Sequence, residues 1–170
     1  MHLSRLRPGA LLVATPLLVD PNFARSVVLV LQHDDDGSLG VVLDRPTTIP
    51  VAEFLPDWNA NTVEPAFVFH GGPVQPEVGI GLCIRFGSLE VVELTAPPVD
   101  DAPVRVFGGC AGWGPEQLAG EVAEGAWFVV DFEPEDLITA EPDSLWIDVL
   151  KRQTSDLSIY STYPADPRMN

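Results

Sequence analysis

The stretch Ser26-Val-Val-Leu-Val-Leu-Gln32 is followed by His33-Asp-Asp-Asp-Gly-Ser38 and then by Leu39-Gly-Val-Val-Leu43. The first and last of these segments are apolar and rich in β-branched residues, which is typical of buried strands. The Asp-Gly pair between them is a hairpin signal. The sequence therefore predicts two neighbouring antiparallel strands joined by a turn at residues 33–38.

Outside this hairpin, the chain continues as short apolar segments separated by turn residues. Its 17 prolines and 14 glycines are spread along the whole length, which favours short elements and tight turns. Further strands are predicted at 9–14, 66–69, 78–86, 89–94, 104–107 and 127–132, and short helices at 50–58, 115–124, 135–139 and 144–153. Because most strands precede most helices, the order favours an α+β fold over a parallel sheet of alternating strands and helices.

Length and composition indicate one globular domain. The chain has 170 residues, of which 46% are hydrophobic, enough for a core without covalent staples.

Both cysteines, Cys83 and Cys110, lie in apolar runs and are expected to be reduced. No apolar run reaches the roughly 18 residues of a membrane span. The basic N-terminus lacks the cleavage site of a signal peptide, so we expect a cytoplasmic protein with no membrane partner.

The charge argues against one class of partner. There are 25 acidic and 9 basic residues, which gives a formal net charge of −16. Proteins that bind a nucleic-acid duplex usually present a basic stripe that displaces counterions. Here the basic residues are scattered from Arg5 to Arg168, so we expect no direct contact with nucleic acid.

The three aspartates that follow His33 do not predict a metal site. A calcium-binding loop places carboxylates at alternating positions and ends with a glutamate at position twelve. Consecutive aspartates at a hairpin tip point in different directions. We therefore expect a solvated turn at residues 33–38, with no metal and no cofactor.

Two glycine-rich segments suggest the chemistry of a cysteine hydrolase. His70-Gly71-Gly72-Pro73 resembles the loop whose amides stabilise an oxyanion in some esterases, and Gly108-Gly109-Cys110-Ala111-Gly112 has the pattern of a nucleophile elbow. That elbow needs a histidine later in the chain, and no histidine follows His70. Catalysis by Cys110 is therefore the alternative hypothesis, and a close-packed glycine turn is the favoured one.

A third group of residues combines an aromatic ring with scarce positive charge. Trp113 lies between Gly112 and Gly114, and a tryptophan with so little local cover is a candidate stacking surface. The same turn could offer free amides to an anion at the start of the helix that follows. Arg25 and Arg45 are two of the few cations, and both could instead be structural ion pairs.

Several of these segments, taken in order, resemble the AlgH/YqgE family. They are residues 9–16 with Leu18, Asp20, Asn22, Phe23 and 25–28; His33, Gly37 and 40–46; 71–74; and 109–113 with Gln117, Leu118, Glu121, Ala126 and Trp127. Four motifs in sequence order are specific, and they cover the chain from about residue 9 to residue 150. The resemblance implies a bent, bifurcated, mostly antiparallel sheet that forms a pseudo-barrel with peripheral helices, in an α+β fold.

The resemblance has further implications for organisation and function. It divides the chain into an N-terminal arm (1–8), a single domain (9–155) and a C-terminal tail (156–170). It implies a bacterial cytoplasmic protein labelled as a transcriptional regulator of exopolysaccharide synthesis, without a defined reaction or cofactor. Two residues depart from the family pattern: Asp44 replaces an asparagine, and Cys110 replaces the usual tyrosine. The second departure excludes a cysteine nucleophile common to the family.

Three hypotheses about function follow. The first is a non-catalytic binding or regulatory protein that acts through a protein or small-molecule partner. The second is a hydrolase or transferase that uses Cys110. The third is a transcriptional regulator, for which the negative charge disfavours direct DNA contact.

The predicted binding site brings several of these segments to one concave surface, with Trp113 partly exposed. It consists of Arg25, Arg45, His70, Gly71, Gly72, Pro73, Gly112, Trp113 and Gly114. The alternative is that Trp113 anchors the core and both arginines form structural ion pairs.

Overall fold

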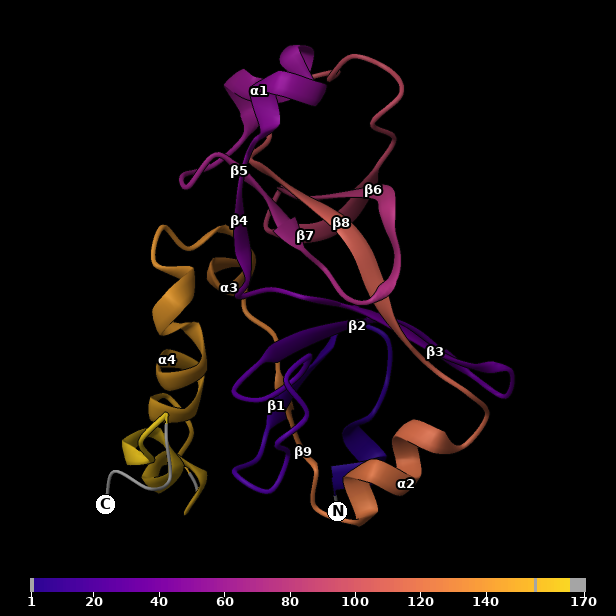
Figure 1. Cartoon of the computed structure of the whole chain (residues 1–170), viewed down its shortest axis with the longest axis vertical. Coiled ribbons are helices and arrows are strands. Elements are labelled where there is room, and N and C mark those ends of the chain that lie inside the picture. The colour runs from indigo at the N-terminus through magenta and orange to yellow at the C-terminus, as the bar shows by residue number, and fades with distance from the viewer. Residues whose placement is uncertain (1, 155, 166–170) are drawn as a thin grey trace.

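One connected sheet of nine strands forms the framework of the part that the computed structural model describes, residues 2–154 and 156–165 (Figure 1). The strands are β1 (Ala10–Ala14), β2 (Val27–Asp34), β3 (Gly37–Val42), β4 (Pro46–Pro50), β5 (Phe67–His70), β6 (Val74–Arg85), β7 (Ser88–Val92), β8 (Val104–Trp113) and β9 (Trp127–Asp131). The main path runs β4-β5-β8-β3-β2-β1-β9, and β6 with β7 branches from β8. Strand pairs are antiparallel apart from β5 with β8. The α+β fold and the mostly antiparallel, bifurcated sheet are confirmed, but the sheet does not close into a barrel.

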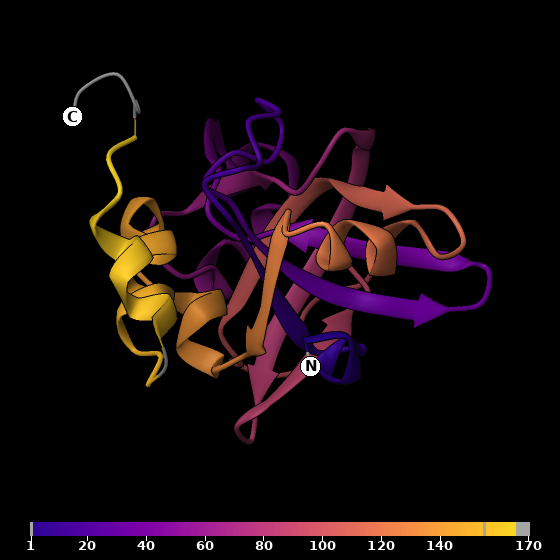
Figure 2. The ribbon, with the colours of Figure 1, turned by 90° about the horizontal axis from the view of Figure 1, so that it is seen from below.

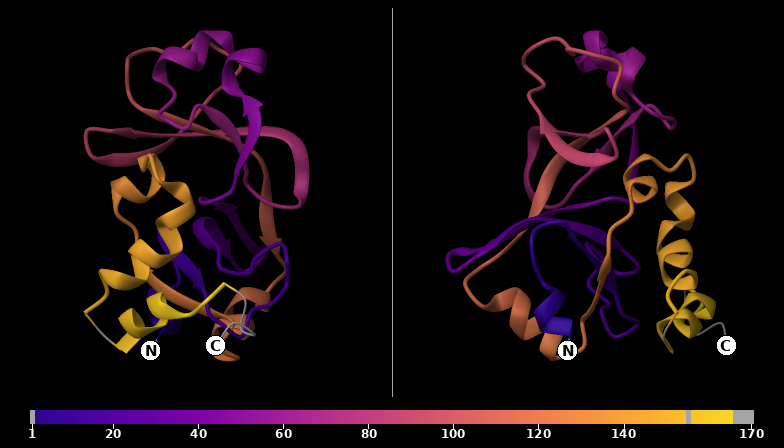
Figure 3. Two further views of the ribbon diagram at one scale, coloured as in Figure 1. Left: turned by 60° about the vertical axis from the view of Figure 1, so that its left-hand side comes forward. Right: turned by 180° about the vertical axis from the view of Figure 1, so that it is seen from behind.

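Short helices surround this sheet. They are η1 (His2–Arg5), α1 (Val51–Phe54), η2 (Pro56–Asn61), α2 (Gln117–Ala123), α3 (Pro134–Ile138), η3 (Pro142–Ser144), α4 (Leu145–Lys151) and η4 (Asp156–Thr162). The helices α4 and η4 lie on one side of β1 and β9, and α2 lies on the other (Figure 2). Figure 3 shows η1 and η4 at one end of the molecule, with α1 and η2 at the opposite end. Each helix among the described residues falls short of the length and apolar character that a transmembrane helix requires.

The hairpin of β2 and β3 forms as the sequence predicts. Val28 pairs with Val42 across the two strands. Residues 27–30 are all fully buried because both faces of β2 are covered. Leu29 packs in the core cluster that includes the apolar side chains of α4, whereas Val28 packs in the cluster that includes those of α2. A continuous apolar run at the centre of the sheet thus reflects two cores, one on each face.

Strand β8 corrects the expectation of a glycine turn at residues 108–112. The strand continues through these residues to Trp113. Gly108 and Gly109 are needed because another backbone segment lies against them: an added Cβ atom would overlap the carbonyl oxygen of Pro76 at Gly108 and that of Gly72 at Gly109. The amide of Gly71 also donates a hydrogen bond to the carbonyl of Gly108, with an N–O distance of 2.9 Å.

Two further elements, β4 and α2, differ from the prediction. The proline-containing strand β4 was not predicted; it lies at the end of the sheet, where a missing N–H is tolerated. Helix α2 begins two residues later than expected, because Glu116 adopts a left-handed conformation with φ of 63°.

Part of the predicted C-terminal tail packs onto the domain. Leu157 and Tyr160, both in η4, lie against the core cluster that includes the side chains of α4. Residues 166–170 of the predicted tail, including Arg168, and Met1 of the predicted arm lie outside the described residues. The proposed boundaries at residues 8 and 155 stay a prediction.

Candidate functional site

Arg45 fixes the loop between β1 and β2. Its guanidinium donates hydrogen bonds to the carbonyl oxygens of Pro21, Asn22 and Ala24, at 2.8, 2.7 and 2.7 Å. Its own carbonyl accepts a hydrogen bond from the amide of His70 at 2.8 Å. Arg45 therefore holds main-chain oxygens, rather than the carboxylate that an ion pair would provide.

Arg25 ends this loop in an unusual backbone conformation. Its φ angle is 57°, in the left-handed region that residues other than glycine rarely adopt. The guanidinium carbon lies 4.1 Å from the centroid of the Trp146 ring, and Nη1 donates a hydrogen bond to the Tyr163 carbonyl at 2.9 Å. Burial lowers the pKa of Arg25, and nearby Asp44 opposes that shift. The group stays protonated, because an arginine remains charged in proteins.

These residues border a pocket of about 390 Å³, which we call the Arg25 pocket. Its walls come from the loop that follows β1, from Trp146 in α4 and from residues 163–165. Leu18, Val19 and Pro164 contribute apolar surface. Arg25 is the one charged side chain among the described residues that line it. The pocket thus combines apolar walls with a single fixed cation.

Asp44 lies close enough to influence this cation. One carboxylate oxygen accepts a hydrogen bond from the amide of Val27 at 3.2 Å. Burial raises the pKa of Asp44 to about 7, while this hydrogen bond and the charge of Arg45 act in the opposite direction. The side chain therefore changes its charge near neutral pH.

Trp113 is a core anchor, and the expectation that it is partly exposed is wrong. Only 7% of the residue is accessible to solvent. Its ring packs against those of Phe23 and Trp127. The indole nitrogens of Trp113 and Trp127 both donate to one carboxylate oxygen of Glu121, at 3.1 and 3.0 Å. Phe23 and Trp127 supply the cover that the flanking glycines do not.

The other predicted site residues are distributed around this core. Gly71 and Gly72 follow β5 and pack against the backbone of β8, which also contains Gly112. Of the nine predicted site residues, only Arg25 lines the Arg25 pocket. A binding role for Arg45, for residues 70–73 and for residues 112–114 stays a prediction.

Cys110 lacks the surroundings of a catalytic nucleophile. It lies within β8, whereas a nucleophile elbow requires a turn between a strand and a helix. Burial raises the pKa of its thiol, which disfavours the reactive thiolate. No hydrogen bond joins this thiol to His33 or His70, the two histidines whose side chains the structure describes. The Nδ1 atom of His33 instead lies 2.7 Å from the Ser38 hydroxyl.

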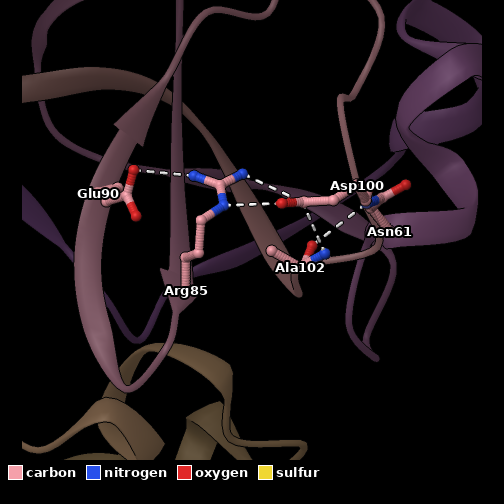
Figure 4. Close-up of polar contacts among 5 residues, drawn as sticks. All are labelled: Asn61, Arg85, Glu90, Asp100 and Ala102. Carbon is pink, nitrogen blue, oxygen red and sulfur yellow. Dashed lines mark hydrogen bonds and ion pairs between the residues drawn. The ribbon is translucent and has the colours of Figure 1, made fainter.

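A second pocket of about 170 Å³ lies between η2, β6 and the loop after β7. Arg85 borders it, and Figure 4 shows its guanidinium between Glu90 and Asp100. Nη1 donates to Glu90 at 2.8 Å, and Nε and Nη2 donate to Asp100 at 2.8 and 3.1 Å. The side-chain Nδ2 of Asn61 donates to the main-chain carbonyls of Asp100 and Ala102 (Figure 4). The donors of Arg85 are thus used to stabilise the loop after β7.

Sequence reasoning missed two parts of the Arg25 pocket. Trp146 falls in the helix that the sequence predicts at residues 144–153; that helix is present, but its pattern does not indicate a site. Tyr163 was assigned to the tail, although its carbonyl reaches an arginine 138 residues away. No local pattern signals a contact of that separation. Among the described residues, no cluster of three or more histidine, cysteine or acidic side chains could hold a metal ion.

Comparisons with known proteins place the chain in a family. The family model described as AlgH-like matches residues 11–158. A UPF0301 protein of Streptomyces coelicolor is 47% identical, with 95% of this chain and 94% of the relative covered. A UPF0301 protein of Thermobifida fusca is 41% identical, with 99% and 98% covered.

Solved structures agree with these sequence matches. The crystal structure of a Corynebacterium diphtheriae protein has a TM-score of 0.86 and 31% identity to this chain, with 92% of each chain covered. The solution structure of the AlgH protein from Pseudomonas aeruginosa has a TM-score of 0.66 and 24% identity, with 92% and 94% covered, and shows a shared fold. The residues matched by the family model include most of the sheet, Arg25 and Trp146, whereas residues 163–165 of the Arg25 pocket lie beyond the match. The chain therefore belongs to the AlgH-like family of bacterial proteins.

Proposed function

We propose that this protein is a non-catalytic binding or regulatory protein that takes up a small molecule in the Arg25 pocket. The observation that carries the proposal is the position of the Arg25 guanidinium, stacked on Trp146 at an apolar pocket. Ligand sites are typically apolar concavities of about 300–1,000 Å³ with a few polar groups that fix the ligand's orientation. The Arg25 pocket has this size and this composition.

The other pockets support a ligand less well. The pocket beside Arg85 is smaller, and its arginine already binds two carboxylates. A pocket of about 450 Å³ between β4 and residues 140–143 has only Glu141 and Asp143 as charged lining residues among those described. In a protein with a net charge of −16, that surface adds negative charge without a compensating donor. The Arg25 pocket is therefore the favoured site.

The proposal also states where the protein acts and that it does not contact DNA directly. We place the protein in the bacterial cytoplasm, where a small-molecule signal could act through it on a protein partner. A regulatory role would then operate without direct DNA contact, because the negative charge repels phosphate.

A thermal-shift screen of bacterial metabolites tests the proposal. A ligand present at 100 times its dissociation constant should add roughly 2.7 kcal/mol to the free energy of unfolding. The variant Val19→Asp changes an exposed wall of the Arg25 pocket and should remove the shift. The matched control Val99→Asp makes the same change at an exposed residue of the pocket beside Arg85 and should leave the shift intact.

Two results would contradict the proposal. One is a broad metabolite screen that produces no saturable shift. The other is a shift that survives in Val19→Asp and disappears in Val99→Asp, which would move the site to the second pocket.

A further inference from the structure

We infer that the ligand of the Arg25 pocket is an amphipathic carboxylate, with an apolar chain or ring in the pocket and its carboxylate bound by the guanidinium of Arg25. This inference rests on the proposed function and adds the chemical class of the ligand. It follows from the unused donors of Arg25, from the rigidity of its support and from the apolar walls beside it.

The first argument is the number of free donors. A guanidinium has five N–H groups, and the described part of the chain supplies one acceptor to Arg25, the carbonyl oxygen of Tyr163. Other arginines are better satisfied: Arg85 binds two carboxylates, and Arg152 binds Asp136 through two nitrogens. Among the described residues Arg25, Arg45 and Arg105 form no ion pair, but Arg45 donates to three main-chain carbonyls and Arg105 to two, whereas Arg25 donates to one. Its fork geometry suits a carboxylate, which can accept two parallel hydrogen bonds.

The second argument is that the guanidinium is held in place before a ligand arrives. The three hydrogen bonds of Arg45 hold the loop that leads to Arg25. The left-handed backbone at Arg25 persists because this surrounding structure imposes it. Below the guanidinium, the ring of Trp146 is fixed by its own hydrogen bond to the Ala14 carbonyl at 2.9 Å. A preorganised donor binds more tightly, because little side-chain freedom is lost on binding.

The third argument is the chemistry of the remaining walls. Leu18, Val19 and Pro164 offer no charge to a second polar group of a ligand. A hydrophilic anion such as inorganic phosphate would bury none of this apolar surface, and a cationic ligand would be repelled by Arg25. A molecule with one apolar part and one carboxylate satisfies both halves of the pocket.

Octanoate and 1-octanol separate the two halves experimentally, because they share the chain length and differ in the head group. Isothermal titration calorimetry on the full chain should show octanoate binding at least 10-fold more tightly than 1-octanol. Arg25→Gln should weaken octanoate binding at least 10-fold and leave 1-octanol unchanged. Arg7→Gln, at an exposed arginine outside the pocket, is the matched control and should behave like the wild type.

A second measurement needs no variant. In nitrogen-15 NMR spectra of the wild-type protein, octanoate should shift the Arg25 Nε–H signal, and 1-octanol should not. Equal affinity for the two probes, or an Arg25 Nε–H signal that does not shift when octanoate is added, would overturn the carboxylate inference and leave the pocket as a binding site. If neither probe binds and the metabolite screen is also negative, the proposed function itself fails.

Discussion

At the scale of single residues, Asp44 is held in a position that favours its neutral form. Burial raises its pKa from the ordinary value of 3.8 to about 7, although Val27 donates a hydrogen bond to the carboxylate and Arg45 attracts it. The folded protein therefore binds this proton more tightly than the unfolded chain between these pH values. The stability that protonation contributes is present below about pH 4 and is lost as the pH rises through about 7.

Asp44→Asn should remove this dependence on pH. Asparagine keeps an oxygen that can accept the hydrogen bond from Val27 and carries no charge. At pH 8 the variant should be more stable than the wild type by on the order of 2 kcal/mol, allowing for solvent screening of a partly exposed group. At pH 4 the difference should be small. Urea unfolding at pH 8 and pH 4 measures this difference in stability. Asp35→Asn, at the exposed hairpin tip, is the control. Parallel pH profiles of stability for the wild type and Asp44→Asn would contradict the prediction.

Arg105 shows which single residues cannot be identified from the sequence. It is 1% exposed within the apolar strand β8, with its charge over the ring of Phe69. Nη1 donates to the Thr139 carbonyl and Nη2 to the Glu64 carbonyl, at 3.0 and 2.9 Å. Burial lowers the pKa of Arg105 to about 10, so it stays charged at neutral pH. Because these acceptors lie 34 and 41 residues away, no local pattern indicates that a charged side chain is buried here.

At the scale of elements, the close approach of the segment after β5 to β8 depends on glycine. Gly72→Ala should destabilise the protein by about 1–3 kcal/mol or more, because the new Cβ atom meets the backbone of Cys110 and cannot be relieved by a side-chain rotation. Gly120→Ala is the matched control, since no atom lies within 4 Å of the added Cβ in helix α2. That variant should be more stable by about 0.5–1 kcal/mol. Denaturant unfolding tests both signs, and equal effects at the two positions would refute the packing argument.

The loop after β7 is held by an ion pair that can be tested in the same way. Asp100→Asn should increase amide hydrogen exchange in residues 93–102, because Arg85 loses the charge that binds the loop. Asparagine can still accept the hydrogen bond from the amide of Ala102, so the local turn should remain. Asp101→Asn, at the exposed neighbouring position, is the control and should leave exchange unchanged. Exchange that rises equally in both variants would assign the effect to lost negative charge in general.

Elements with a strong local pattern were predictable, and elements defined by distant partners were not. The hairpin of β2 and β3 was predicted because its apolar runs and its turn are contiguous. The path of β8 through Cys110 was not predictable, because its glycines suggest a turn, whereas in the fold Gly109 allows the backbone of Gly72 to pack closely against the strand. At the site, Arg25 was predicted from its scarcity as a cation. The contact between Arg25 and Trp146 could not be predicted, because the two residues are distant in the sequence and meet only in the folded chain.

At the scale of the whole molecule, one sheet separates two hydrophobic cores. Side chains of β1 alternate between them, with Leu11 and Val13 in the core that includes α4, and Leu12 in the core that includes α2. Fully apolar strands predict burial on both faces, but they do not predict which helix covers which face. That choice places α4 beside the loop of Arg25, so the arrangement of the cores determines where the Arg25 pocket forms.

The net charge of −16 leads to a prediction about nucleic acid. Ion pairs and carbonyl contacts occupy Arg5, Arg85 and Arg152, and Arg105 is buried, so these cations are not free to form a basic stripe. Binding to a duplex gains free energy mainly by releasing counterions from phosphates, and an acidic surface cannot supply that gain.

We therefore expect no change in the fluorescence anisotropy of a labelled 20-base-pair duplex when this protein is added at about 10 mM salt, where attraction between opposite charges is least screened. A known basic DNA-binding protein on the same duplex is the positive control, and its affinity should fall as salt is added. Saturable binding of the duplex by this protein, weakening with salt in the same way, would show a cationic surface that the charge distribution excludes. Absence of binding would leave protein or small-molecule partners as the interactions to test.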